Sequence, residues 1–384
     1  MKAKTVWFRA GSLSVASALL ATGCVPAAKP QHNTSTAVVR QAIPAVVPPG
    51  ATPQPPAYLT NQIASLGRNF NGRVGISVRD IQAGWSVSFN GGIPFPQQSV
   101  SKTWVGLAVM DAVDRGQLAL HQEVVVKESD LTLFHQPIRQ FMKNGSYRTT
   151  VAELLECAMT RSDNTCNDVL LWKAGGPTAV RSTLARHGLD GITFGPGERH
   201  LQAKIAGLEW RSEWAGGEGF MRARAALPRE TRAAALDRYL AQPYDGATPD
   251  GITTALARLR QGQLLTARST QTLLSLMARS RTGQARMRAG LAPGWALAHK
   301  TGTGQTLGSF ATGYNDVGIL TSPDGRTYAV AVMIAGTSEP IPVRQRLMAD
   351  VVRTVVQTAP IGPADELVQN TRPYNPGAGV TVQR

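Results

Sequence analysis

Strand-like alternation occurs near both ends of this chain, with helical periodicity between. Apolar residues recur at every second position, as in half-buried strands, over 74–78, 85–89, 295–298, 316–320 and 328–334. Strands from opposite ends of a chain bury their apolar faces most readily by pairing in one sheet. We therefore expect the first hairpin to pair with the C-terminal strands in a single antiparallel sheet.

The helical segments fall into two groups. Those at 58–70 and 343–356 adjoin the strands and are expected to flank the sheet. The others lie between the strand groups, at 99–115, 151–160, 167–174, 178–187, 230–240 and 269–278. The pattern predicts an α+β fold, a three-layer α/β/α arrangement in which an antiparallel sheet with flanking terminal helices carries an inserted all-helical domain.

Two domains follow from this organisation. A discontinuous α/β domain would comprise 57–95 and 293–360, and the helical domain would comprise 96–292. Clefts between such domains are the usual place for small-molecule sites, so we expect the functional residues there.

The first 24 residues have the features of an export signal. A cationic start precedes a short apolar stretch, 13–21, and small residues lead to Gly23-Cys24. This ending resembles a bacterial lipobox, in which the cysteine is acylated and becomes the new N-terminus, although Ala21 stands where that motif prefers leucine. We expect a signal peptide with a lipobox over 1–24, with secretion without a lipid as the alternative.

The segments next to the fold are expected to be non-globular. Prolines interrupt 25–56, which predicts a semi-rigid tether, and the polar segment 361–384 predicts a mobile tail. Val25 follows the cysteine at the position where an aspartate would favour retention in the inner membrane. These features predict a periplasmic lipoprotein whose only membrane contact is an outer-membrane lipid anchor at Cys24.

Composition argues against several other classes. The net charge is +15, but the basic residues form no long Lys/Arg block, so we expect a basic solvated surface and no nucleic-acid partner. The histidines form no H-x-H or H-E-x-x-H pattern, so no metal is expected. We also expect no cofactor, and we expect the protein to act as a monomer. Cys157 and Cys166 are expected to be small core side chains, with a disulfide as the alternative because export exposes them to an oxidising compartment.

Three short motifs carry groups suited to acyl transfer. Ser99 and Lys102 lie three residues apart at a predicted helix start, so their side chains share one face, and a lysine of lowered pKa can take the serine proton. Ser162-Asp163-Asn164 lies between two predicted helices and can project a hydroxyl and an amide. Lys300-Thr301-Gly302-Thr303-Gly304 follows a predicted strand and offers a cation, hydroxyls and close backbone approach. Each motif alone also fits an ordinary helix start, N-cap or turn.

In this order the motifs resemble those of the penicillin-recognising serine enzymes, and specifically the class A β-lactamases. The resemblance covers roughly 58–358 and includes Gly175-Gly176-Pro177. Glu198 lies thirty-six residues after Ser162, which is the spacing of the family's deacylating glutamate. The resemblance implies a serine β-lactamase that hydrolyses the amide of a small-molecule β-lactam.

The resemblance also implies roles for single residues. Ser99 would be the nucleophile, Lys102 and Glu198 the candidate acylation bases, and Ser162 the group that passes a proton to the departing nitrogen. Glu198 would then activate the hydrolytic water, and the backbone N–H groups of Ser99 and Thr303 would form the oxyanion hole. The substrate-binding residues would be Asn164, Lys300, Thr301, Gly302 and Thr303.

The surroundings of the glutamate depart from the family pattern. The family has Arg and Trp directly before it and Asn four positions after it, where this chain has Pro196, Gly197 and Gln202. The missing arginine removes a salt bridge that holds the omega loop in the family. An extended omega-loop insert at about 203–247, longer than the family norm by about three dozen residues, is expected to be a self-packed surface loop. A lid, a partner surface or a second wall of the cleft are the alternatives.

Two other functions remain open on the same scaffold. One is a DD-peptidase-like serine hydrolase, and the other is a penicillin-binding or sensing module that is acylated without turnover. Glu198 discriminates between these functions and the β-lactamase, because peptidases and sensors of this type lack a dedicated deacylation carboxylate.

Overall fold

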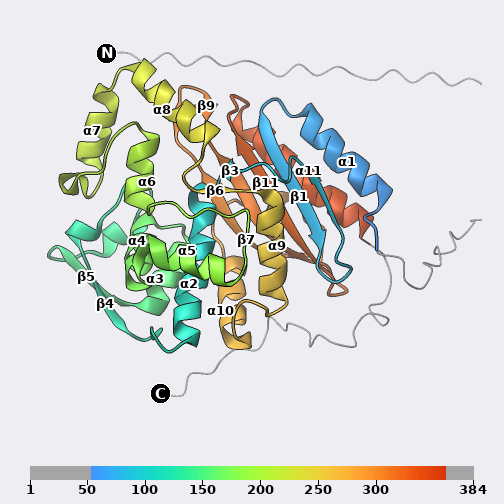
Figure 1. Ribbon diagram of the computed structural model, residues 1–384, viewed down its shortest axis with the longest axis horizontal. Coiled ribbons are helices and arrows are strands. Elements are labelled where there is room, and N and C mark those ends of the chain that lie inside the picture. Colours follow the sequence, from blue (N-terminus) through green and yellow to red (C-terminus); the bar gives the residue numbers. More distant parts are fainter. Residues whose placement is uncertain (1–52, 360–384) are drawn as a thin grey trace, which may run out of the picture. The chain divides into compact units, whose positions relative to one another are not determined.

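A five-stranded antiparallel sheet lies at the centre of the structure, a computed structural model that describes residues 53–359 (Figure 1). In order across the sheet, the strands are β2 (Ser86–Phe89), β1 (Arg73–Asp80), β11 (Thr327–Ala335), β10 (Tyr314–Thr321) and β7 (Ala296–Thr303). Every neighbouring pair is antiparallel. The N-terminal hairpin therefore pairs with the C-terminal strands, as the alternation predicted.

The central strand β11 requires cover on both faces of the sheet, because all its residues are buried. One set of alternating side chains faces the first apolar core: Tyr328, Val330, Val332 and Ile334. The other set faces the second core: Ala329, Ala331, Met333 and Ala335. A strand with two buried faces must lie inside a three-layer structure.

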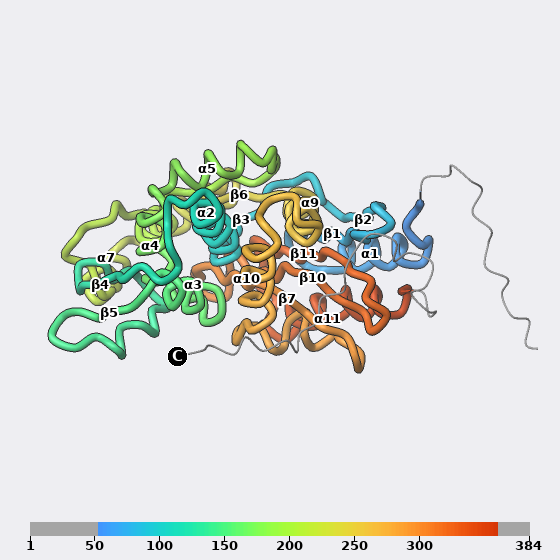
Figure 2. Tube along the Cα trace, turned by 90° about the horizontal axis from the view of Figure 1, so that it is seen from below, coloured from blue at the N-terminus to red at the C-terminus, as the bar shows by residue number. Residues whose placement is uncertain are grey.

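Helices supply this cover. On one face, α1 (Ala57–Asn69) and α11 (Ile341–Thr358) contribute Leu59, Ile63 and Val351 to the first core. On the other face, α9 (Pro249–Arg260) packs on β1 and β11, and α10 (Ala267–Ala278) packs on β7. Figure 2 shows α9 and α11 on opposite sides of the strands. The predicted three-layer α+β fold is confirmed.

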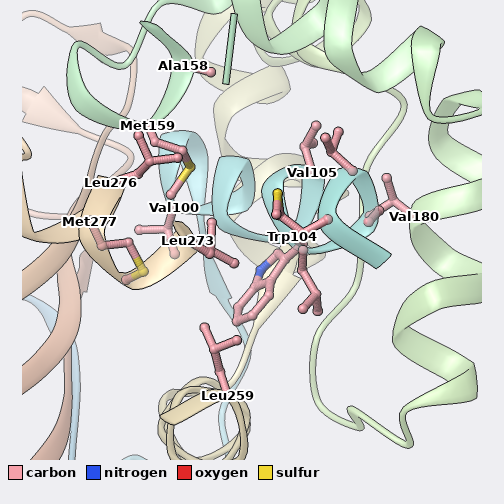
Figure 3. Packing of buried hydrophobic residues seen from close by; sticks show 14 of the residues in the cluster. Val100, Trp104, Val105, Ala158, Met159, Val180, Leu259, Leu273, Leu276 and Met277 are labelled. Carbon is pink, nitrogen blue, oxygen red and sulfur yellow. The ribbon is translucent and has the colours of Figure 1, made fainter. Parts of the chain in front are cut away.

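The helices between the strand groups surround α2 (Lys102–Asp114). This helix is buried on almost all sides, which is typical of a helix at the centre of a core. Its neighbours are α3 (Val151–Thr160), α4 (Asn164–Lys173), α5 (Gly176–Arg186) and α10. Figure 3 shows Trp104 and Val105 of α2 among apolar side chains of these neighbours. This packing fixes the start of α2, where the first motif lies.

The remaining elements are short or belong to the segment around the insert. The helices are α6 (Glu198–Ile205), α7 (Glu218–Ala226) and α8 (Arg229–Ala241). The strands are β3 (Phe95–Pro96), β4 (Glu123–Lys127), β5 (Ser146–Thr150), β6 (Gly246–Ala247), β8 (Thr306–Leu307) and β9 (Phe310–Ala311). The 3-10 turns are Gln98–Ser101, Glu128–Asp130, Pro137–Phe141, Ser212–Trp214 and Met287–Gly290. The sequence analysis predicted α8 but neither α6, α7 nor the β4–β5 hairpin.

Helix α4 begins three residues before the predicted segment 167–174. The reason is a side-chain cap, since Asp163 Oδ1 accepts a hydrogen bond from Cys166 N–H at 2.9 Å. Such a cap satisfies a backbone donor at the helix start. As a result, the second motif spans the cap and the first turn of α4.

The expectation that Cys157 and Cys166 are free core thiols is wrong. The two residues form a disulfide with a Cα–Cα distance of 6.1 Å. The bond joins the last turn of α3 to the first turn of α4, so it spans the short connection that carries Ser162. A covalent link across this connection limits the conformations open to the turn.

The predictions for the signal peptide, Cys24 and the mobile tail concern residues outside 53–359, as does most of the predicted tether. Within 53–359, no helix is both long enough and apolar enough to cross a membrane.

Candidate active site

The three motifs and Glu198 converge on one cavity of ≈ 500 Å³. Ser99 comes from the 3-10 turn before α2, Ser162 from the connection of α3 and α4, and Glu198 from the start of α6. The lining residues are Ser99, Phe134, His135, Ser162, Asn164, Glu198, Gln202, Arg224, Thr282, Arg286, Thr301, Thr303, Gly304, Gln305 and Thr306. Segments far apart in the sequence thus supply one site.

Lys102 is the buried centre of this site. Its side chain is fully buried, and its Nζ donates to Ser99 Oγ at 2.8 Å and to Asn164 Oδ1 at 2.9 Å. A third contact reaches Glu198 Oε2 at 3.2 Å. As an ammonium group, Lys102 has three donors, and these three acceptors match them. The contacts place an amine directly beside the Ser99 hydroxyl.

The carboxylate of Glu198 is held at both oxygens. Oε2 accepts from Lys102, and Oε1 accepts from Gln202 Nε2 at 3.0 Å. Gln202 is fixed in turn, because Gln305 Nε2 donates to its Oε1 at 2.9 Å. Gln202 therefore orients Glu198 directly, from the position where the family has an asparagine.

Ser162 and Lys300 form a second hydroxyl–amine pair in the site. Lys300 Nζ donates to Ser162 Oγ at 2.8 Å and to Thr301 O at 3.1 Å. Burial, together with the positive charges of Lys102 and Arg286, lowers the pKa of Lys300 well below its usual value. Ser162 is thus positioned to exchange a proton with an amine that is readily deprotonated.

The other predicted binding residues also face the site. Asn164 Nδ2 donates to Leu133 O at 2.8 Å, which fixes the amide that contacts Lys102. Thr301 and Thr303 line the cavity from β7, and Gly302 lies between them. A Cβ on Gly302 would lie 2.4 Å from Gln97 O, so only glycine allows β7 to approach the turn that carries Ser99.

Two residues in the left-handed backbone region shape the site. Gln98 has φ +54 directly before Ser99, and Ser162 itself has φ +62. Non-glycine residues with such φ values are uncommon and cost free energy, so the surrounding structure has to hold them. Gln98 directly precedes Ser99 of the Ser99–Lys102 pair, and Ser162 belongs to the Ser162–Lys300 pair.

A buried polar network holds the strained Gln98. Asp245 Oδ2 accepts from Gln98 N–H at 2.7 Å, and Asp245 Oδ1 accepts from Tyr239 Oη at 2.7 Å. Gln98 Nε2 donates to Tyr239 Oη at 2.6 Å, which closes the ring of contacts. Burial raises the pKa of Asp245 to about 6, despite these donors. The insert supplies Tyr239, a role the sequence analysis did not foresee.

The start of α6 has its own anchor, although the family arginine is absent. Asp168 of α4 accepts from Glu198 N–H at 2.7 Å and from Arg199 Nε at 3.1 Å. Arg199 Nη2 also donates to Asp130 O at 3.0 Å. The inferred loss of a salt bridge is therefore compensated by Arg199 and Asp168, which fix the backbone of Glu198 directly.

Arg286 is a further cation in the site that the sequence analysis missed. Its Nη2 donates to Thr303 Oγ1 at 2.6 Å, and its Nη1 donates to Gly302 O at 2.9 Å. Its guanidinium carbon lies 3.7 Å from the centre of the Tyr314 ring. No motif surrounds Arg286 in the sequence, where it is one of many scattered basic residues.

The insert packs against residues outside it and is not a self-packed surface loop. Trp214 and Phe220 bury with Leu133, and the centre of the Phe220 ring lies 5.6 Å from that of Phe134. Helix α7 continues from this contact and carries Arg224 to the cavity. Of the alternatives, a second wall of the cleft is the one that these contacts support.

One group of side chains within 53–359 has the composition of a metal site, namely Cys157, Asp163 and Cys166. Its two sulfur atoms are bonded to each other, and both carboxylate oxygens of Asp163 accept backbone hydrogen bonds. The two sulfur atoms and the two carboxylate oxygens therefore already have partners within the protein.

The chain is similar to known proteins in both sequence and structure. A family model described as "Beta-lactamase enzyme family" matches residues 58–359. A beta-lactamase of Streptomyces fradiae is 30% identical over 290 residues, 74% of this chain and 81% of that protein. Beta-lactamase VEB-1 of Pseudomonas aeruginosa is 25% identical over 77% of this chain and 88% of that protein. The crystal structure of a beta-lactamase from Chitinophaga pinensis has a TM-score of 0.65 at 24% identity, covering 79% of this chain and 99% of that one.

The raised pKa of Asp245 predicts a pH-dependent contribution to stability. An unfolded aspartate has a pKa of about 3.9. Between about pH 4 and pH 6, the folded protein therefore retains a proton that the unfolded chain releases, so stability falls as pH rises through this window. Lowering the pH from 7 to 5 should raise the free energy of unfolding by about 1 kcal/mol relative to Asp245→Asn.

Urea denaturation of wild type and Asp245→Asn at pH 5, 6 and 7 measures this difference. Asp237→Asn is the matched control, because Asp237 is exposed on α8, and it should follow the wild type. If the difference in unfolding free energy between wild type and Asp245→Asn stays constant from pH 7 to pH 5, the assignment is contradicted.

Proposed function

Because the chain belongs to the beta-lactamase enzyme family, we propose that it hydrolyses the β-lactam amide through a covalent acyl-enzyme on Ser99. The observation that carries this proposal is the set of contacts of Lys102. Its Nζ lies 2.8 Å from Ser99 Oγ and 3.2 Å from Glu198 Oε2, so one buried amine connects the nucleophile to a carboxylate.

Acylation begins with attack of Ser99 Oγ on the lactam carbonyl carbon. Lys102 first gives a proton to Glu198, and the Oγ proton then passes to Lys102. The N–H groups of Ser99 and Thr303 donate to the developing oxyanion. The lactam C–N bond breaks, and the departing nitrogen takes a proton from Ser162, which Lys300 replenishes.

Deacylation uses Glu198 as general base. After acylation, Glu198 releases the proton that it accepted to solvent, and Lys300 regains one from solvent. The Glu198 carboxylate then removes a proton from a water molecule, which attacks the ester carbon. The ester C–O bond breaks, and Ser99 Oγ leaves with that proton, relayed from Glu198 by Lys102. Gln202 holds Oε1 through a bond of 3.0 Å, so the carboxylate keeps a fixed orientation through both halves of the reaction. The Asp168–Arg199 pair supports this role by fixing the backbone of the same helix turn.

The substrate carboxylate is assigned to the cationic end of the cavity. Arg286 is a cation that lines this end, and Thr301 and Thr303 provide hydroxyl donors there. Lys300, in its protonated form, adds a second cation at Ser162 Oγ. Asn164 lines the same cavity and is assigned to the amide of the acyl side chain. The substrate is thereby held at two points with its carbonyl at Ser99.

No observation favours the peptidase or the sensing module over the β-lactamase. Both alternatives lack a dedicated deacylation carboxylate, whereas Glu198 is buried, oriented and in contact with Lys102. The Arg199–Asp168 anchor further supports an ordered loop around this carboxylate.

We also propose that the enzyme is an outer-membrane lipoprotein of the periplasm, anchored by acylation of Cys24. The supporting observations are the cationic and apolar start, the Gly23-Cys24 junction and the proline-rich segment that follows. The disulfide Cys157–Cys166 supports export, because such bonds persist in oxidising compartments.

Ser99→Ala should abolish the covalent adduct with benzylpenicillin and lower hydrolysis by on the order of 10⁴–10⁶-fold, because the nucleophile is lost. Intact-mass analysis after rapid quenching detects the adduct, and a chromogenic cephalosporin reports turnover. Ser182→Ala, an exposed serine on α5, is the control and should keep the wild-type adduct. An adduct that persists in Ser99→Ala would refute the assignment.

Cys24→Ser should move the exported protein from the membrane fraction to the soluble periplasmic fraction, because the acylated thiol is lost. Fractionation of cells that express each form, followed by immunodetection, measures the shift. If the wild-type protein is already fully soluble after export, the lipid anchor is refuted.

A further inference from the structure

Arg224 is a cation in the cleft that the proposed mechanism does not use. It lies on α7, within the insert, and lines the cavity together with Ser99, Gln202 and Gln305. Its Nη2 donates to Thr306 O at 3.0 Å, which connects α7 to the segment directly after β7. The guanidinium is therefore held at the cavity from the insert side.

The charge of Arg224 is uncompensated within 53–359. None of the carboxylates in this part of the chain pairs with it, and its buried Nε has no hydrogen-bond partner. Burial and the positive charge of Arg232 both lower the pKa of Arg224. A partly buried cation without an anion costs free energy, which an anionic ligand would offset.

The printed contact of Arg224 is with Thr306, which is not one of the residues of the carboxylate-binding end. That end is made by Lys300, Thr303 and Arg286, which contact one another or the same strand. By contrast, Thr306 follows Gln305, and Gln305 contacts Gln202 beside Glu198. In the proposed orientation, with the ring carboxylate at Lys300 and the side-chain amide at Asn164, the acyl side chain extends toward Gln202, Gln305 and Arg224.

We propose that Arg224 is a specificity-determining residue that binds a carboxylate on the acyl side chain of the β-lactam. The substrate class is penicillins whose acyl group carries its own anionic substituent. This inference rests on the proposed β-lactam hydrolysis and goes beyond it, since it assigns a second anion site to the insert.

Benzylpenicillin and its α-carboxy derivative test the proposal, because they differ by one carboxylate on the acyl side chain. The measured quantity is the ratio of kcat/KM for the α-carboxy compound to kcat/KM for benzylpenicillin. Arg224→Gln should lower this ratio about tenfold, mainly through a higher KM for the α-carboxy compound, because a hydrogen bond to a charged group is lost. Arg224→Lys should retain part of the preference, because the charge remains while the guanidinium geometry is lost.

Arg222→Gln is the matched control, because Arg222 is an exposed arginine on the same helix, and its ratio should equal that of the wild type. Raising the salt concentration should lower the ratio for the wild type but not for Arg224→Gln, since salt screens the ion pair.

Two outcomes overturn the proposal. An unchanged ratio in Arg224→Gln means that Arg224 does not contact the side-chain carboxylate, and if kcat/KM falls equally for both compounds, Arg224 only holds α7 against Thr306. If the wild type hydrolyses neither compound, the proposed function fails as well, so the two failures are distinguishable.

Discussion

The buried ammonium group of Lys102 is the interaction on which the rest of the site depends. A charge that is fully removed from water is tolerated only when donors and acceptors match it closely. Its three acceptors are Ser99 Oγ, Asn164 Oδ1 and Glu198 Oε2. They come from the turn before α2, from α4 and from α6, so the catalytic contacts form only when all three segments have assembled.

A second set of contacts holds the positions of these groups. The left-handed backbone at Gln98 is fixed by Asp245 and Tyr239, and the start of α6 is fixed by Asp168. Through Tyr239 and Asp245, the insert becomes part of the support of Ser99, the proposed nucleophile. The insert thus contributes to the geometry of the site as well as to the wall of the cleft.

Periodicity and motif order predicted the sheet, its flanking helices and the convergence of Ser99, Lys102, Ser162 and Lys300. These features depend on local patterns, such as the alternation of β1 and β11 and the spacing of Ser99 and Lys102 on one helix face. By contrast, the roles of Arg286, Tyr239 and Asp245 depend on contacts between distant segments.

One mistaken expectation and one unforeseen contact have the same physical cause. The pairing of Cys157 with Cys166 depends on how α3 and α4 meet, and composition alone does not determine that geometry. The sequence indicated the loss of the family salt bridge but not its replacement, since Asp168 and Arg199 anchor the loop from another direction. A substitution in one contact can be compensated by a partner that lies far away in the sequence.

In the proposed mechanism, Glu198, oriented by Lys102 and Gln202, activates the water that hydrolyses the acyl-enzyme. The single-turnover rate of deacylation in Glu198→Gln, followed by quenched intact mass with benzylpenicillin, measures this role most directly. The variant should accumulate acylated Ser99 and deacylate ~10²–10⁴-fold more slowly than the wild type. Glu209→Gln, which changes an exposed glutamate in the insert, should deacylate normally. Deacylation of Glu198→Gln at the wild-type rate would contradict this role of Glu198.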